Sequence, residues 1–494
     1  MVRHVALETV NSAIQNQQLD VSSLNDVKEN LMDYIRRVYG SSDTAETEVD
    51  QANIQNKMTQ TITYLFVTLY AEHWQSFFDD FLGLASHKTS NGTSNRAGVF
   101  LYLRAASAVH DEIADVLVPR SPEEQQRNNL LKDLIRQRDV HKVALSWQEI
   151  LAQRRAIPND PVVEMCLKVI GRWASWVDIS LVINENLMNM LFELIARPNS
   201  GTTEDGVDQV RNAAVETLTE IVGKKMLPPA KIELISFLKL ETIINHLISS
   251  PALHELRSSA NYDTDLAEAV AKLVNNATGD IIRALETDSV DQAGRQEAQR
   301  MLQVFLAFAL RFFSDEYDEI CSTVIPCLTD LLTYLRKEKK KVAQAADYTT
   351  ILEPILKAIM TKMKYDETSS WGEEDEQTDE AEFQDLRKRL HVLQQAVAAV
   401  DESLYIGEIS RLGYATFTAL SERQGQVDWR DLDLVLYEMY LFGDLAVKQG
   451  GLYVRNQPTG PAAETLIGMM TKMIESGRFP YSSPIAAARQ GMSI

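Results

Sequence analysis

Cysteine, glycine and proline are scarce in this chain. Its 494 residues include 3 cysteines, 21 glycines and 14 prolines. Cys166, Cys321 and Cys327 are too few for a disulfide scaffold and indicate a reducing compartment. Glycine and proline together make up about 7% of the residues, below the usual ~12%, as expected when most residues are helical.

Long hydrophobic runs and an excess of basic residues are also lacking. The longest apolar run, from Met301 to Phe313, contains Arg311 and is much shorter than the ~20 residues needed to span a bilayer. It is predicted to form a buried helix. Acidic residues outnumber basic ones by 70 to 49, and the net charge of −21 argues against general adhesion to DNA or anionic membranes. We therefore expect no DNA binding and no membrane insertion, while one local basic face stays compatible with this composition.

Apolar residues recur at helical spacing in nearly every segment. No sustained alternation with a period of two residues occurs. The helical period predicts an all-α protein. Clear apolar faces are formed by Val140, Val143, Ala144, Trp147, Ile150 and Leu151, by Val162, Val163, Cys166, Val169, Ile170, Trp173 and Val177, and by Val324, Ile325, Leu328, Leu331, Leu332 and Leu335.

Helix breakers are expected between the helices rather than inside them, at Pro158, Pro198, Pro228, Pro229 and Pro251. Two helices with two short turns take roughly 40 residues, the length of a HEAT or armadillo repeat. Such a pair cannot bury its apolar face alone, so neighbouring pairs must stack. The sequence therefore predicts a HEAT-repeat α-solenoid, a superhelical arch of ten or eleven pairs over residues 1–480. Separate helical bundles are the alternative.

One segment breaks this pattern. Residues 366–385 carry ten carboxylates and neither lysine nor arginine. A run of like charges repels itself, so this acidic loop region is predicted to be a mobile loop until about Thr378. A helix is expected to follow, with Arg387, Lys388 and Arg389 on its first exposed turns. Residues 481–494 are predicted to form an irregular tail.

A basic cluster ends an earlier helix and consists of Arg336, Lys337, Lys339, Lys340 and Lys341. Cations near a helix C-terminus interact favourably with the helix dipole. A solvated surface remains an alternative interpretation of both the basic and the acidic runs.

Sequence motifs for catalysis are missing. The chain contains no phosphate-binding glycine loop, no H-E-x-x-H and no C-x-x-C, and its eight histidines have no zinc-ligand spacing. Cys321 and Cys327 are interpreted as small buried hydrophobes. We therefore expect neither enzyme activity nor a metal site or cofactor.

Eight stretches along the chain carry distinctive motifs, namely Tyr64–Tyr70, His73–Leu82, Leu101–Arg104, Asp111–Asp115, Arg127–Arg136, Trp176–Val182, Asn189–Leu191 and Met363–Lys388. In sequence and in order they resemble the exportin branch of the importin-β (karyopherin) superfamily, and most closely its exportin-T family. Members of the family are about twice as long. The resemblance thus implies a fragment covering the N-terminal half without the first repeat. We expect such a fragment to bind tRNA weakly, with little or no enhancement by GTP-loaded Ran.

The resemblance implies a nuclear export receptor for tRNA that shuttles between nucleus and cytoplasm. Such a receptor binds tRNA cooperatively with the GTP form of the small GTPase Ran, crosses the pore through FG-repeat proteins, and releases both ligands after GTP hydrolysis. Candidate tRNA-binding residues are Arg104, Arg127, Lys132 and Arg136, for which salt bridges between repeats are an equal alternative. Candidate Ran-contact or regulatory residues in the acidic loop are Glu373, Glu374, Asp375, Glu376, Asp379 and Glu380.

Other classes of function remain open. A HEAT-repeat transport or scaffold protein with protein cargo is the main alternative. A protein-cargo receptor would retain proteins in a Ran-dependent manner but no tRNA at moderate salt. An enzyme would need a clustered, buried set of titratable groups.

Overall fold

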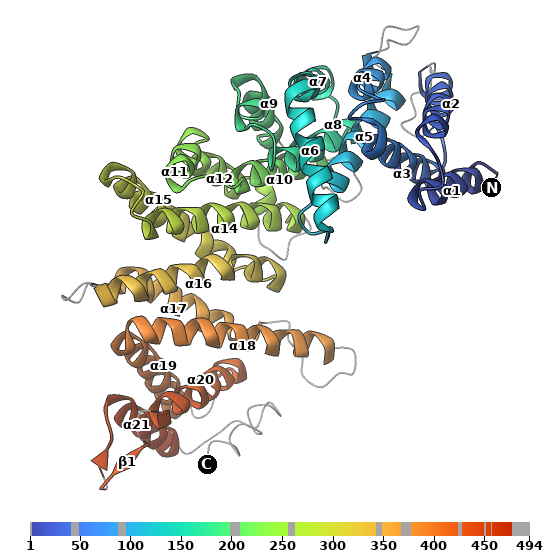
Figure 1. Cartoon of the computed structure of the whole chain (residues 1–494). Helices are drawn as coiled ribbons and strands as arrows, with labels where there is room; N and C mark the ends of the chain where they lie inside the picture. Colours follow the sequence, from blue (N-terminus) through green and yellow to red (C-terminus); the bar gives the residue numbers. More distant parts are fainter. Residues whose placement is uncertain are drawn as a thin grey trace. The chain divides into compact units, whose positions relative to one another are not determined.

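The computed structural model describes residues 2–40, 49–86, 95–197, 208–254, 262–341, 348–366, 377–422, 427–448, 451–455 and 457–476. These residues form 21 α-helices, one short 3-10 helix and one two-stranded hairpin (Figure 1). The predicted all-α class is therefore confirmed, and the helix number agrees with ten or eleven pairs. By its internal contacts the chain divides into two compact units.

Unit 1 comprises Met1–Met226 and Asn245–Leu273. Its helices α3, α5, α8 and α10 pack successively on one another, while α4, α7 and α9 alternate with them along the chain. Its elements are α1 (Val2–Gln15), α2 (Val21–Tyr39), α3 (Ala52–Leu69), α4 (Phe77–Ser86), α5 (Arg96–Ile113), α6 (Pro122–Arg138), α7 (Val140–Arg154), α8 (Pro161–Ala174), the 3-10 helix η1 (Ile179–Leu181), α9 (Glu185–Ile195), α10 (Gln209–Gly223) and α13 (Pro251–His254).

Unit 2 comprises Leu227–Ile244 and Val274–Ile494. Helices α16 and α18 pack together, as do α17 and α19 and then α19 and α21, so helices two positions apart stack here as well. Its elements are α11 (Pro228–Phe237), α15 (Gln292–Phe313), α16 (Asp318–Lys341), α17 (Thr349–Lys362), α18 (Gln377–Val400), α19 (Glu402–Glu422), α20 (Trp429–Lys448), β1 (Tyr453–Val454), β2 (Gln457–Pro458) and α21 (Pro461–Ser476). Helices α12 (Leu240–Ile248) and α14 (Thr264–Glu286) have residues in both units.

The apolar faces read from the sequence form the core. All six predicted residues of α7 and all six of α16 are buried. In unit 1, Trp74, Phe77 and Phe78 are at most 2% exposed, as expected for core residues. Their rings lie within an aromatic cluster in which Phe77 contacts Phe66 at 4.7 Å and Trp74 at 4.9 Å between centroids. This packing stabilises α3 against α4.

The three cysteines are buried, as the sequence suggested. Cys166 lies in α8 of unit 1, and Cys321 and Cys327 lie in α16 of unit 2. Burial raises the pKa of each thiol, because the thiolate would lose its hydration. These side chains therefore behave as small hydrophobes.

The positions of the prolines were predicted only in part. Pro228, Pro229 and Pro251 begin helices and Pro158 lies between α7 and α8, whereas Pro198 lies outside the described residues. However, Pro326 and Pro354 lie inside α16 and α17, so the expectation that breakers stay outside helices is wrong. An internal proline costs ~3 kcal/mol. Burying nine apolar residues of α16 outweighs that cost.

Two glycines permit the close approach of α19 and α21. A Cβ atom at Gly413 would lie 2.5 Å from Sδ of Met469, and one at Gly468 would collide with the Tyr414 hydroxyl. Each glycine thus faces a bulky side chain of the other helix, and this reciprocal fit fixes their register.

Candidate nucleic-acid interface and polar groove

Helix α6 carries three of the four candidate tRNA-binding residues. It begins with a capping box, in which the Ser121 hydroxyl accepts from the Glu124 N–H and the Glu124 carboxylate accepts from the Ser121 N–H. Only Asn128, Leu131 and Ile135 of this helix are buried. Most of α6 therefore faces solvent, as a surface for a ligand must.

Arg127 is bound within the chain. Its guanidinium lies 3.0 Å from a carboxylate oxygen of Glu112 at the end of α5 and donates to Asn128 at 3.1 Å. Arg120 contacts the same carboxylate oxygen at 3.1 Å. The Asn128 amide in turn donates to the Glu112 carbonyl. These bonds attach α6 to α5, in line with the salt-bridge alternative for Arg127.

Arg136 is bound in a similar way, and Lys132 is not. The Arg136 guanidinium donates twice to the Trp176 carbonyl, at 2.8 and 3.2 Å, and lies 5.6 Å from the Trp176 ring centroid. Lys132 lies one helical turn earlier and has no ion pair within the described part of the chain. Burial and the nearby Arg136 lower the pKa of Lys132. The structure brings these two candidates together, and of the two only Lys132 has an ammonium without an ion pair among the residues described.

Arg104, the fourth candidate, lies on another helix. It projects from α5, and its Nη2 donates to the Asn56 side-chain oxygen of α3 at 2.5 Å. Arg104 therefore stabilises the packing of α3 on α5.

Arg172 is a cation that the sequence reasoning missed. Its Nη1 donates to the Ser107 hydroxyl at 2.5 Å and to both carboxylate oxygens of Asp111 at 3.1 Å. Burial, together with Arg172 and Lys132, lowers the pKa of His110 to about 4, so this imidazole is neutral at pH 7. Its Nδ1 accepts from the Trp176 indole at 3.1 Å. Lys132 and Arg172 therefore act on the same histidine.

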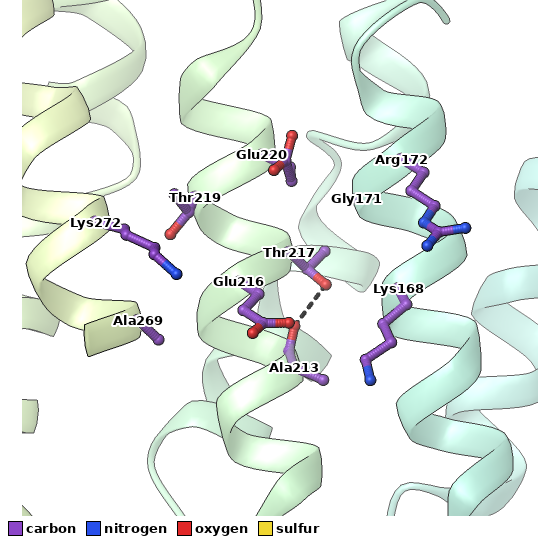
Figure 2. Close-up of a pocket in the computed structure, with 10 residues that line it drawn as sticks. All are labelled: Lys168, Gly171, Arg172, Ala213, Glu216, Thr217, Thr219, Glu220, Ala269 and Lys272. Carbon is purple, nitrogen blue, oxygen red and sulfur yellow. Dashed lines mark hydrogen bonds between the residues drawn. The ribbon is translucent and has the colours of Figure 1, made fainter. Parts of the chain in front are cut away.

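Arg172 also lines an open groove between α8, α10 and α14. Figure 2 shows Glu216 and Glu220 on α10, between Lys168 and Arg172 of α8 and Lys272 of α14. The space has a volume of about 380 Å³ and continues along α10 toward Gln209 and Asp265. Gly171 faces Glu220 and Thr217 there, and its lack of a side chain keeps the two helices close.

The cations and carboxylates of this groove are unequally engaged. Lys168 lies 2.6 Å from Glu164, and Lys272 lies 2.7 Å from Glu268, one helical turn away in each case. Glu216 and Glu220 have no ion pair among the residues described. Burial and the charge of Glu216 raise the pKa of Glu220. The negative charges of these two carboxylates would repel the phosphates of an RNA backbone. The groove is therefore better suited to a polar protein surface than to RNA.

Of the six candidate residues of the acidic loop, two lie in the described part of the chain and four do not. Glu373, Glu374, Asp375 and Glu376 lie outside the described residues. Helix α18 starts at Gln377, close to the expected end of the loop, so the last part of the region 366–385 is helical. Asp379 lies in its first turn. Glu380 accepts from the Tyr365 hydroxyl at 2.8 Å and from the Gln384 amide at 2.6 Å.

Arg387 is not on an exposed turn, contrary to expectation, but fully buried. It donates to the Met363 carbonyl at 2.6 and 2.8 Å and lies 2.8 Å from a carboxylate oxygen of Asp433. The rings of Tyr365, Phe383 and Tyr437 lie 4.4–4.7 Å from the guanidinium carbon. Arg387 follows Phe383 by four residues and precedes Leu390 by three, so it falls on the apolar face. That spacing was the signal that could have revealed it.

Among the described residues, no group of three or more histidine, cysteine, aspartate or glutamate side chains could hold a metal ion. No described helix is long and apolar enough to cross a membrane.

Comparison with protein families gives two matches. Residues 292–490 match the family described as Exportin-T, and residues 51–218 match the family described as Exportin 1-like protein.

Curated relatives are similar over nearly the whole chain. Exportin-T of Aspergillus fumigatus (strain Af293) is 54% identical over 486 residues, which are 98% of this chain and 47% of that protein. Exportin-T of Botryotinia fuckeliana is 54% identical over 494 residues, or 100% of this chain and 47% of that protein. Exportin-T of Emericella nidulans is 52% identical over 486 residues. The chain therefore spans about half the length of the curated relatives it matches.

Solved structures are more distant. A Kap121p mutant has a TM-score of 0.33 and 11% identity, covering 99% of this chain and 54% of that one. A SYS-1/POP-1 complex gives 0.36 and 14%, covering 96% and 85%.

Proposed function

Because the chain belongs to the exportin-T family over the half of its relatives' length that it spans, we propose that it serves as a nuclear export receptor for tRNA. It binds tRNA cooperatively with the GTP form of Ran and releases both in the cytoplasm after GTP hydrolysis. The observation that carries the proposal is 54% identity to curated exportin-T proteins over 98% of the chain. The protein acts as a binding receptor rather than an enzyme.

Coupling between the two ligands follows from their shared preference for one conformation. When tRNA and GTP-loaded Ran both select the same arrangement of the repeats, each raises the affinity of the other by the same factor. Stacked helix pairs support such coupling because each pair contacts only its neighbours and small rotations add along the stack. FG-repeat proteins of the nuclear pore are the further partners, and the receptor shuttles between nucleus and cytoplasm.

RNA binding through exposed cations predicts a steep dependence on salt. Each phosphate neutralised by lysine or arginine releases counterions, so the logarithm of affinity falls linearly with the logarithm of salt concentration. The decisive experiment is an electrophoretic mobility shift with mature tRNA, with and without saturating GTP-loaded Ran. Retarded tRNA supports the proposal, and no retarded tRNA at low salt contradicts it. A tenfold or greater gain in affinity with GTP-loaded Ran would contradict the expectation of weak coupling in a chain that spans about half the length of its relatives.

The candidate residues on α6 can be separated by their bonding. Lys132→Gln removes a cation that has no ion pair in the described part of the chain, so we expect RNA affinity to fall several-fold and the salt slope to fall by about 1. Arg136→Gln instead loses its bonds to Trp176, so we expect less protection of α6 in hydrogen exchange. An unchanged affinity of Lys132→Gln would remove this residue from the interface.

A receptor for protein cargo is the alternative. It is favoured by the groove of Figure 2, where Glu216 and Glu220 present acceptors without an ion pair among the described residues. Such a receptor would retain proteins in the presence of GTP-loaded Ran and would retain no tRNA at moderate salt.

A further inference from the structure

The basic cluster at the end of α16 contains cations of two kinds. The Lys339 ammonium donates to the carbonyl of Val400, the last residue of α18. A cation at a helix C-terminus satisfies a carbonyl that has no partner within the helix. Lys339 thus has a structural role in joining α16 to α18.

The other four cations of the cluster point to solvent. Lys337 lies 2.8 Å from Glu286 of α14, and Lys341 lies 2.8 Å from Glu338. Arg336 and Lys340 are exposed, lie one helical turn apart and have no ion pair in the described ranges. The helix dipole alone does not require four exposed cations in two turns.

The corner between α14 and α15 adds a fifth cation. Arg295 donates to the Thr287 carbonyl at 3.0 Å and lies 3.7 Å from Asp288. Arg295 and Asp288 both influence the titration of Lys341, so this corner lies beside the end of α16. We call these five cations, Arg295, Arg336, Lys337, Lys340 and Lys341, the α16 surface. Three carboxylates, those of Glu286, Asp288 and Glu338, pair with members of it. Because five cations outnumber three carboxylates, the surface is net positive, although the chain as a whole has a charge of −21.

Two cations of the α16 surface, Arg336 and Lys340, are less engaged within the protein than the candidate tRNA-binding arginines on α6. Arg127 and Arg136 are held by a carboxylate and a carbonyl, so RNA would have to displace those bonds. Arg336 and Lys340 have no ion pair with any residue that the structure describes, so binding phosphate breaks no such pair. Exposed lysines and arginines contact the backbone without reading sequence, as recognition of folded tRNA by shape requires.

We propose that the α16 surface binds the phosphate backbone of RNA, with Arg336 and Lys340 making the principal contacts. The proposal rests on the proposed function, because it takes tRNA as the ligand. The candidate tRNA-binding residues predicted from the sequence all lie on α5 and α6, so the α16 surface would be an additional contact with tRNA.

The test compares two double variants by titration of labelled tRNA at several salt concentrations. R336Q/K340Q removes two cations of the α16 surface. K357Q/K388Q removes two exposed lysines that each lie beside a carboxylate elsewhere in unit 2, and therefore changes net charge equally. We expect R336Q/K340Q to weaken binding about tenfold or more at 0.1 M salt and to reduce the salt slope by between 1 and 2. The control should change affinity less than twofold, and both variants should keep the thermal midpoint of the wild type.

Equal tRNA affinities of the two variants would refute the RNA-binding role of the α16 surface but leave the proposed function intact. If R336Q/K340Q lost binding to GTP-loaded Ran but kept its tRNA affinity, the surface would belong to a protein interface, and its RNA-binding role would also be refuted. A wild-type chain that binds no tRNA even at low salt would refute both proposals.

Discussion

At the scale of single residues, Arg387 determines how the helices around the acidic segment are held. It bonds to the Met363 carbonyl at the end of α17 and to Asp433 of α20, while projecting from α18. Three aromatic rings surround it, and both members of the ion pair are fully buried. Removing either Arg387 or Asp433 would leave its partner as an uncompensated buried charge. The loss of either residue should therefore lower the stability by more than the loss of the hydrogen bonds alone would.

Arg387→Gln should therefore lower the free energy of unfolding by ~3–5 kcal/mol, since it leaves Asp433 buried opposite a neutral group. Lys388 is the matched control, because its side chain is 74% exposed and lies 2.7 Å from Asp385 in an exposed ion pair. Lys388→Gln should change stability by less than about 0.5 kcal/mol. Denaturant unfolding followed by circular dichroism measures both, and equal effects would contradict the role given to Arg387.

Glu438 makes the stability of the same region depend on pH. Burial raises the pKa of Glu438 to about 7 from an ordinary value of 4.5, although the Gln394 amide and Arg387 lower it in part. Tyr405 of α19 also faces this carboxyl. Between these two pKa values the folded state binds more protons than the unfolded state, so stability falls as pH rises from about 4.5 to 7.

Glu438→Gln removes this titration while keeping the bond to Gln394 possible. We expect the thermal midpoint of the wild type to fall relative to that of Glu438→Gln between pH 5 and 8, by the equivalent of about 2–3 kcal/mol. Glu353→Gln, at an exposed pair with Lys357, serves as the control. Parallel midpoint curves for wild type and Glu438→Gln would show that Glu438 is ionised throughout.

At the scale of elements, the sequence predicted helix faces well and polar contacts poorly. The apolar positions of α7 and α16 follow from periodicity alone, because every third or fourth residue must leave water. The continuation of α16 through Pro326 and the burial of Arg387 depend on neighbours that are distant in sequence. The hairpin of β1 and β2, in which Tyr453 pairs with Pro458, could not be predicted from the sequence. Its strands have two residues each, too few to show the alternation of apolar and polar residues that is typical of a strand.

The candidate site shows the same limit. Sequence similarity singled out Arg127, Lys132 and Arg136, but only coordinates reveal that Glu112 and the Trp176 carbonyl already hold two of them. Arg172 was missed because its partners, Ser107 and Asp111, lie more than sixty residues earlier.

At the scale of the whole molecule, we propose that the acidic residues of the region 366–385 couple ligand binding to ligand release. Replacement of Glu373, Glu374, Asp375 and Glu376 by glutamine should alter the coupling between GTP-loaded Ran and tRNA. The thermal midpoint should hardly change, because a run of like charges repels itself and contributes little to stability. Ran-dependent tRNA titration and thermal unfolding measure the two effects, and a large loss of stability would favour a purely structural role.

The buried thiols give each unit a native reporter of its own opening. Cys166 belongs to unit 1, whereas Cys321 and Cys327 belong to unit 2, and none is exposed. A thiol-reactive dye can therefore modify each only while the surrounding helices are transiently apart. Labelling of C321A/C327A follows unit 1, and labelling of C166A follows unit 2. Comparing the two labelling rates with and without tRNA would show in which unit the bound ligand suppresses transient opening.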